Sequence, residues 1–420
     1  FDNNGSAAQL NGISTSGTMN TLASSLPVLL NDSLDIGNAS ANALMVQSTV
    51  TGNSAGTKTI SNVGTGVGLV TLSGAISDGG GAVAINQNST TSPLLLSGAN
   101  SYTGGTTVTA GILTVNATGS LPGGTATVAG GATLAVRTGN WTAVAIDSLR
   151  GAATWSAATA ALGFDTTAGN FAYASDITEA LSVNKLGNNT LTLSGANSYS
   201  GNTIATAGAL VASTPASLPG YDSSGRVIFN GGTIGVDPAG WTSTEVDTLL
   251  ANATKTSGAL GFDTTASGSA TQASAYTAAA LGSLGINKLG ANTLTLDQAN
   301  THTGPTIVTG GTLKLSNADA ISSSSGLVLR GGAVELTTGV TIQSLTFDVA
   351  ANQSVTGGAL NFLPGGMILQ MVNNYNGTIT STITGSPTVQ TTDGPLGNTY
   401  EGLKFEPAAG NTQTLGAILN

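Results

Sequence analysis

The chain contains no cysteine and has few charged and few aromatic residues. Without cysteine it can form neither disulfides nor thiolate sites. Charged residues make up 7% of the 420 residues, against about 25% in an ordinary soluble domain, and the net charge is −10. This weakly acidic composition, with no basic stripe, excludes nucleic acid as a partner.

Long apolar runs are missing as well. No run approaches the roughly 18 apolar residues of a membrane helix, so we expect no membrane insertion of this segment. The chain opens at Phe1-Asp2 with neither an initiating Met nor a signal peptide, so we expect a processed product or a segment of a longer polypeptide. What is abundant is glycine (60 residues) and small aliphatic side chains, which suit tight turns around a thin core.

Three stretches of the chain nearly repeat one another. They read LLLSGANSYTGGTTVTAGIL from Leu94, LTLSGANSYSGNTIATAGAL from Leu191 and LTLDQANTHTGPTIVTGGTL from Leu294. Leucine alternates with threonine in steps of two, which indicates a strand, and Gly and Asn then tolerate the positive φ of a turn. Downstream, segments from Ser120, Ser217 and Ile321 each predict a strand, a Gly-Gly turn and another strand.

Two architectures fit this pattern. Short, evenly punctuated strands, a repeat long enough for several coils and a thin aliphatic core favour a right-handed parallel β-helix, in which each coil pairs with the coils above and below. An array of antiparallel β-sandwiches is the alternative. We expect one continuous β-helix with N-terminal coils or a cap at 1–60, the repeat β-helix at 61–336 and C-terminal coils at 337–420.

Two further segments resemble each other and are expected to interrupt the strands, near 140–165 and 240–263. In the second, Thr242 and Glu245 have the spacing of a capping box, and apolar residues follow on one helical face. The sequence predicts a short helix near 243–252 and a weaker counterpart near 143–150. The corresponding segment from Thr337 predicts a strand instead.

The residues K-L-G-x-x-T-L-T-L-x-x-x-N-x-x-x-G, at Lys185–Gly201 and Lys288–Gly304, resemble the autotransporter-associated β-strand repeat, also called the passenger-associated transport repeat. The copy at 94–115 keeps LSGANSYTGGTTV but has STTSPL where KLG would stand. The resemblance covers roughly residues 90–336. It implies an exported, β-helical bacterial surface protein and says little about activity, because the family includes adhesins, matrix proteins and supports for enzymes.

Carboxylates are the first candidates for catalysis, because parallel β-helices include pectin-cleaving enzymes and glycosidases need two carboxylates about 5–10 Å apart. The close pairs are Asp32/Asp35, Asp176/Glu179, Glu245/Asp247 and Glu401/Glu406. Apart from Lys404 between Glu401 and Glu406, none has Arg or Lys nearby in sequence, although folding could bring one. Asp147/Asp247 and Asp165/Asp263 recur at matching positions, which favours a structural task such as hydrogen-bonding a turn backbone.

His302, the sole histidine, stands where the other copies have Tyr102 and Tyr199, so we interpret it as a turn residue rather than a catalytic base. The tyrosines, with Tyr221, could stack on sugars, but shielding of the turn backbone is the preferred interpretation. Thr-x-Thr pairs return too irregularly for an ice-binding face. Neither the calcium-coil pattern nor EF-hand spacing is present, so we expect no catalytic, cofactor-binding or metal-binding residues and no cofactor.

These observations predict a non-catalytic, extracellular or cell-surface structural protein. With little charge to oppose contact, and with few charged groups in the first and last stretches of the sequence, we expect copies to join end to end into filaments or a surface layer. The expected partners are therefore the chain itself and cell-surface or matrix glycans. A monomeric adhesin-type stalk and a polysaccharide-active β-helix enzyme are the alternatives.

Overall fold

The computed structural model describes residues 8–12, 19–272, 274–322, 325–348, 353–370, 377–384, 388–391 and 404–405. The chain divides into two compact units, Phe1–Gly208 and Ala209–Asn420, each of which is described by itself. Within the described residues, the helices are too short or too polar to cross a bilayer.

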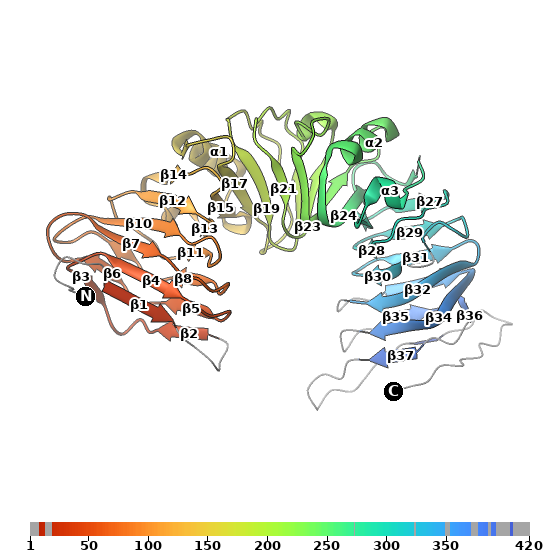
Figure 1. Cartoon of the computed structure of the whole chain (residues 1–420), viewed down its shortest axis with the longest axis horizontal. Coiled ribbons are helices and arrows are strands. Elements are labelled where there is room, and N and C mark those ends of the chain that lie inside the picture. The colour runs from red at the N-terminus through yellow and green to blue at the C-terminus, as the bar shows by residue number, and fades with distance from the viewer. Residues whose placement is uncertain are drawn as a thin grey trace. The chain divides into compact units, whose positions relative to one another are not determined.

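Unit 1 is a stack of coils whose strands pair in parallel with the strands of the next coil (Figure 1). Sheet A consists of β1 (Ala8–Gly12), β4 (Leu34–Asn38), β7 (Lys58–Asn62), β10 (Val83–Asn88), β12 (Thr106–Ala110), β14 (Thr127–Val128) and β16 (Thr154–Trp155). Sheet C consists of β3 (Val28–Leu30), β6 (Val50–Gly52) and β9 (Ile76–Ser77). In this unit, sheet B contains β2 (Met19–Leu22), β5 (Ala43–Val46), β8 (Val70–Leu72), β11 (Leu94–Leu96), β13 (Ile112–Val115), β15 (Thr133–Arg137), β17 (Ala161–Asp165), β18 (Phe171–Tyr173), β19 (Ser182–Leu186), β20 (Thr190–Leu193) and β21 (Thr203–Ala205).

Unit 2 follows the same plan. Its sheet B strands are β22 (Ala209–Ala212), β23 (Val227–Val236), β24 (Thr254–Asp263), β26 (Gly285–Leu289), β28 (Thr306–Val308), β30 (Gly326–Leu329), β32 (Val340–Phe347), β34 (Ala359–Gln370), β36 (Thr382–Thr384) and β37 (Thr388–Thr391). Sheet D consists of β25 (Ala270–Thr271), β27 (Thr293–Leu296), β29 (Thr312–Leu315), β31 (Ala333–Leu336), β33 (Gln353–Gly357), β35 (Gly377–Ile379) and β38 (Lys404–Phe405). Parallel pairing in both units confirms the β-helix and shows that the antiparallel sandwich is wrong.

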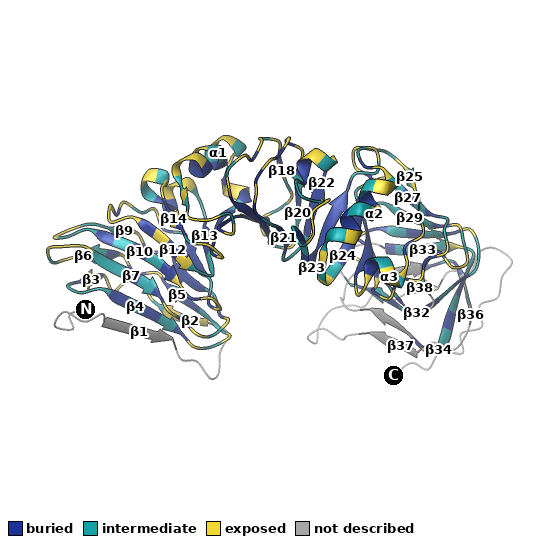
Figure 2. Ribbon diagram, turned by 45° about the horizontal axis from the view of Figure 1, so that its top comes forward, coloured by how far each residue is buried: buried dark blue, intermediate teal, exposed yellow. Residues whose placement is uncertain are grey.

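The core is built from the side chains that point into the coils. In β4, for example, Leu34 and Ile36 are buried while Asp35 between them is not, the period-two pattern expected of a strand (Figure 2). The middle strands of sheet B depart from this pattern, because every residue of β17 is buried. Small residues make this possible: a Cβ at Gly163 would lie 2.6 Å from the Cβ of Ala135 in the neighbouring strand.

The two predicted helices are present, α1 at Ala143–Ala152 and α2 at Ser243–Asn252. Each begins after a threonine cap. The Thr242 hydroxyl accepts from the Glu245 backbone N–H at 3.3 Å, and the Glu245 carboxylate accepts from the Thr242 backbone N–H at 2.7 Å, which completes the capping box. A tryptophan precedes each helix, and the Trp241 indole N–H donates to the Ala212 carbonyl at 2.9 Å.

The segment from Thr337 contains β32, as predicted. The Gly-Gly turns are confirmed only in part. Gly130-Gly131 and Gly331-Gly332 separate two strands, whereas Gly231-Gly232 remains inside β23 as a bulge at which the register shifts. A bulge of this kind needs a residue that tolerates positive φ, and Gly231 has φ 103°. Four short 3-10 helices (Thr118–Ser120, Pro122–Gly124, Thr138–Asn140 and Pro215–Ser217) and a one-turn helix, α3 (Ala278–Leu281), were not predicted.

Candidate functional site

The lysine of the repeat motif lies inside the coil rather than on the surface. Lys185 is fully buried in β19, opposite Phe164, and its ammonium donates to the carbonyls of Leu186 (2.7 Å), Gly187 (2.8 Å) and Ala207 (3.1 Å). Burial lowers the pKa of Lys185 to about 7, and the Asp165 carboxylate acts in the opposite direction. The three carbonyls favour the ammonium, because a neutral amine has only two N–H groups to donate.

Lys288 repeats this arrangement in unit 2. It is fully buried and donates to the carbonyls of Leu289 (2.6 Å), Gly290 (2.9 Å) and Gly310 (3.1 Å). Burial lowers its pKa to about 8, opposed by Asp263. In both copies the lysine therefore joins a turn to the turn of the next coil through its side chain.

The copy at 94–115 uses an amide where the other two use lysine. Gln87 pairs in register with Val108, as Lys185 pairs with Ala205. Its side-chain N–H₂ donates to the carbonyls of Ser89 (2.8 Å) and Ser92 (3.0 Å). In all three copies, the position of the lysine is thus occupied by a side chain that donates hydrogen bonds to turn carbonyls. The first copy has this donor although it lacks the KLG sequence.

The glycine and the aspartate of the same turns fit together. Gly187 has φ 73°, and a Cβ there would lie 2.6 Å from Asp165 Oδ1 and 2.5 Å from the Thr167 backbone nitrogen. Asp165 Oδ1 in turn accepts from the Thr167 backbone N–H at 3.0 Å, and Asp263 accepts from that of Thr265 at 2.9 Å. These carboxylates have the predicted structural task of holding a turn.

The asparagine of the GAN or QAN turn bridges three coils. Asn100 Oδ1 accepts from the Ile76 backbone N–H at 2.9 Å, and its amide donates to the Ser120 carbonyl at 2.8 Å. Asn300 likewise accepts from the Tyr276 N–H and donates to the Ala320 carbonyl. Each of these asparagines supplies the hydrogen bonds that a turn backbone needs at a coil boundary.

The residue that varies between tyrosine and histidine has one constant partner. The hydroxyls of Tyr102 and Tyr199 lie 2.6 and 2.5 Å from the threonine hydroxyl four residues on, and His302 Nε2 lies 2.9 Å from Thr306 Oγ1. All three rings are buried, which supports the turn interpretation and leaves Tyr102 and Tyr199 unable to stack on a sugar. Burial lowers the pKa of His302 to about 4.

One carboxylate cluster was missed at the sequence level. Arg150, buried in α1, donates to Asp147 at 3.1 Å and to Glu179 at 2.5 Å. Asp147 also accepts from the hydroxyls of Tyr173 and Ser175. The i, i+3 spacing of Asp147 and Arg150 in a predicted helix was the available signal. The cluster ties α1 to the coil that follows it, and each of its carboxylates has a protein partner.

Other acidic residues of the sequence pairs bond to backbone groups. Asp176 accepts from the Ala196 backbone N–H at 2.7 Å, and Glu245 caps α2. Glu401 and Glu406 lie outside the described residues. Asp78, in the glycine-rich segment considered for calcium, accepts from the Val83 N–H and the Thr103 hydroxyl. The described residues contain no cluster of three or more His, Asp or Glu side chains able to hold a metal ion.

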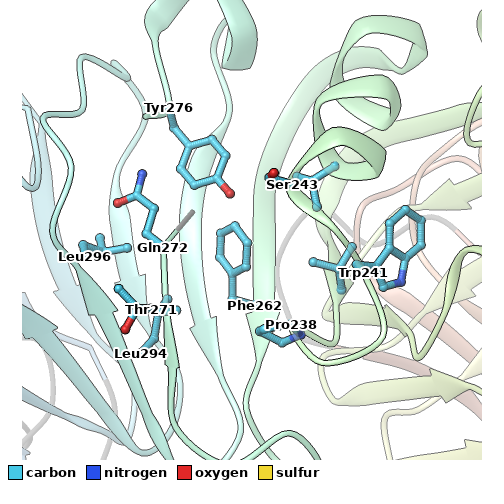
Figure 3. A pocket seen from close by; sticks show the side chains of 11 residues that line it. Pro238, Trp241, Ser243, Phe262, Thr271, Gln272, Tyr276, Leu294 and Leu296 are labelled. Carbon is cyan, nitrogen blue, oxygen red and sulfur yellow. The ribbon is translucent and has the colours of Figure 1, made fainter. Parts of the chain in front are cut away.

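Unit 2 contains a small pocket between the start of α2, the end of β24 and sheet D (Figure 3). Trp241, Phe262 and Tyr276 form its aromatic wall, and Leu294 and Leu296 contribute apolar surface. Its volume is about 60 Å³. This pocket could not be predicted from the sequence, because its residues come from four separate segments.

Comparison with known proteins agrees with the repeat geometry. The passenger-associated-transport-repeat model matches residues 94–115, 183–212 and 286–315. The chain is 29% identical over 331 residues to the "Adhesin BmaC autotransporter" of Brucella suis biovar 1 (strain 1330); the match covers 73% of this chain and 9% of the adhesin. The chain thus spans only a small part of that relative. No solved structure matches it. Each matched segment contains the asparagine and the tyrosine or histidine contact, and the second and third also contain the buried lysine, so the chain carries three segments similar to the passenger-associated transport repeat.

Proposed function

We propose that this chain is a non-catalytic part of an exported, surface-displayed β-helical passenger with an adhesive or structural role. The observation that carries the proposal is that the motif residues point inward. Lys185 and Asn100 bond to neighbouring coils, and Tyr199 bonds within its own turn to Thr203, which supports a repeat that encodes stacking rather than a reactive cleft.

The match to an autotransporter adhesin supports an exported, adhesive role. The charged side chains described above support the absence of catalysis, because they hold turns, cap a helix or pair with one another. Catalysis needs carboxylates with an open space between them for substrate and water. The carboxylates of the Arg150 cluster and of the Asp165 turn are hydrogen-bonded to protein groups, which supports a structural role for them.

The finer proposal is that copies, or successive segments of a longer chain, join end to end into a filament or surface layer. Parallel coils stack by backbone hydrogen bonds, and the same bonding can continue from one copy to another. With 7% charged residues, little electrostatic repulsion opposes such contact. Glycans of a cell surface or matrix remain the proposed outside partner.

Surface display is tested by shaving intact producing cells with proteinase K and probing for this segment with an antibody. We expect the segment to be degraded without lysis, and cells that lack it to adhere less to host-cell or matrix-coated surfaces. Protection of the segment until lysis would overturn the proposal. Assembly is tested separately by light scattering and negative-stain microscopy of purified protein over a concentration series. Particles that stay monomeric would contradict end-to-end assembly and favour a monomeric adhesin-type stalk. Cleavage of pectin or alginate, abolished by an Asp→Asn change, would establish an enzyme.

A further inference from the structure

The pocket in unit 2 lies beside β25, a strand whose residues differ from those of its counterpart in unit 1, β18. In unit 1, Phe171 and Leu191 pair in register, and Tyr173 follows two residues later on the same strand. In unit 2 the corresponding leucine, Leu294, pairs with Ala270, so Gln272 stands where Tyr173 stands in unit 1. Gln272 lines the pocket, and the ring of Tyr276 packs against Phe262 at 5.4 Å, as the ring of Tyr173 packs against Phe164 at 5.2 Å in unit 1.

Tyr276 provides a free hydrogen-bonding group in this space. It is 4% exposed and its ring lies 5.4 Å from that of Phe262, but its hydroxyl has no hydrogen-bond partner among the described residues. In Figure 3 the hydroxyl points toward the space between Phe262 and Ser243. In unit 1 the buried Tyr173 hydroxyl, by contrast, donates to Asp147. Burial raises the pKa of Tyr276, so the hydroxyl remains a donor at neutral pH.

The other polar lining groups define the rest of the ligand. The Gln272 amide is already occupied, since it bonds to Ser274 and Asn300. Ser243 and Thr271 line the pocket as well, and neither hydroxyl has a partner among the described residues. No charged side chain lines the pocket, and the Asp247 carboxylate, which together with burial raises the pKa of Tyr276, disfavours an anion, so its ligand is a neutral group.

Size limits the group further. The volume of about 60 Å³ is less than half of the roughly 150 Å³ cavity that accepts benzene. A group of about four heavy atoms with one apolar end and one acceptor therefore fits. An acetamido group meets these requirements, because its methyl can pack on Phe262 and Leu296 while its carbonyl accepts from Tyr276.

We propose that this pocket binds the acetamido group of an N-acetylated amino sugar, with the sugar ring at the mouth beside Ser243 and Thr271. The methyl lies among Phe262, Leu294 and Leu296, and the Tyr276 hydroxyl donates to the acetamido carbonyl. The free hydroxyls at the mouth favour a sugar, whose own hydroxyls can bond to them. This inference goes beyond the proposed surface role and does not require surface display, since it concerns the isolated chain.

Saturation-transfer-difference NMR on the purified full chain tests the proposal, with N-acetylglucosamine as probe. We expect saturation to be strongest at the acetamido methyl and binding in the millimolar range, while methyl glucoside, which lacks the acetamido group, shows none. Tyr276→Phe removes only the hydroxyl and should weaken binding about five- to tenfold. Tyr173→Phe, the same change in unit 1, should leave binding unchanged.

A second variant guards against indirect effects. Thr271→Tyr occludes the mouth at an exposed position, so it should abolish binding while the melting temperature stays within error of the parent. Absence of saturation transfer, equal transfer to methyl glucoside, or unchanged affinity in Tyr276→Phe would each overturn the proposal. Stronger binding of N-acetyllysine than of N-acetylglucosamine would overturn the assignment to a sugar. None of these outcomes bears on whether the segment is displayed on cells.

Discussion

Replacement of His302 by tyrosine should remove a pH-dependent loss of stability. His302 is fully buried and bonds to Thr306 through Nε2, and its Nδ1 has no partner among the described residues. Its pKa is about 4 in the folded chain and about 6.5 in an unfolded one. Between these values the unfolded state binds a proton that the folded state does not, so stability falls as pH falls from about 6.5 to 4.

The magnitude follows from the pKa difference. Each pKa unit corresponds to about 1.4 kcal/mol, so a lowering of roughly two and a half units costs about 3 kcal/mol by pH 4. Tyrosine already fills this position in the other two copies, where it bonds to the equivalent threonine. His302→Tyr should therefore match the parent at pH 7.5 and exceed it by about 2–3 kcal/mol at pH 4.5.

Urea unfolding of both proteins at several pH values, followed by tryptophan fluorescence, measures this difference. Acid effects on the carboxylates are shared by the two proteins and cancel in the comparison. Tyr199→His is the matched control, because it should introduce the same acid sensitivity into unit 1. Parallel stability curves for the parent and His302→Tyr between pH 7.5 and 4.5 would refute the reasoning.

Three further substitutions test the coil contacts by equilibrium unfolding at pH 7.5. Lys185→Met keeps the aliphatic stem but leaves carbonyls unpaired, so we expect a loss of about 2–4 kcal/mol, whereas Lys314→Met, at a half-exposed ion pair, should cost at most about 1 kcal/mol. Equal losses would contradict the role of the carbonyl contacts. Gly187→Ala should cost at least about 2 kcal/mol more than Gly105→Ala, since both have positive φ but only the first would clash. Arg150→Met should lower the free energy of unfolding by about 1–3 kcal/mol. This is less than for a fully buried ion pair, because the carboxylates of Asp147 and Glu179 are about one-third exposed. No measurable loss would show that solvent already satisfies these carboxylates.

The sequence predicted features that depend on local periodicity. Leucine–threonine alternation predicted the strands, and the capping box at Thr242 and Glu245 predicted α2 with its bounds. It did not reveal that Gln87 takes the place of Lys185, because this equivalence rests on strand register and not on the spacing of the KLG motif. Register between distant coils is set by packing of the whole stack, which a linear pattern does not encode.

Contacts between separate segments were also beyond the sequence. Acidic pairs were sought as neighbours in the chain, whereas Glu179 meets Arg150, 29 residues away. The pocket is lined by Gln272 and Tyr276, which lie between Asp263 and β26 in a segment longer than its counterpart between Asp165 and β19, so a direct alignment does not show their place. The expected division at residues 60 and 336, and the absence of catalytic and cofactor-binding residues, stay predictions.

The position of conserved chemistry within the three copies indicates where a function of this chain should be sought. Residues that the copies share, such as Asn100 and Asn300, form side-chain hydrogen bonds between coils. They cannot also contact a partner without unfolding a turn. The residue type can vary at outward positions, because these side chains do not contact the core of the coil. Thr107 in one copy corresponds to Ile307 in another. We therefore expect a specific activity where the coils of one unit differ from those of the other, as at Gln272 and its counterpart Tyr173. Gln272 is such a departure, and the unpaired Tyr276 hydroxyl beside it is the chemical group that stacking leaves unused.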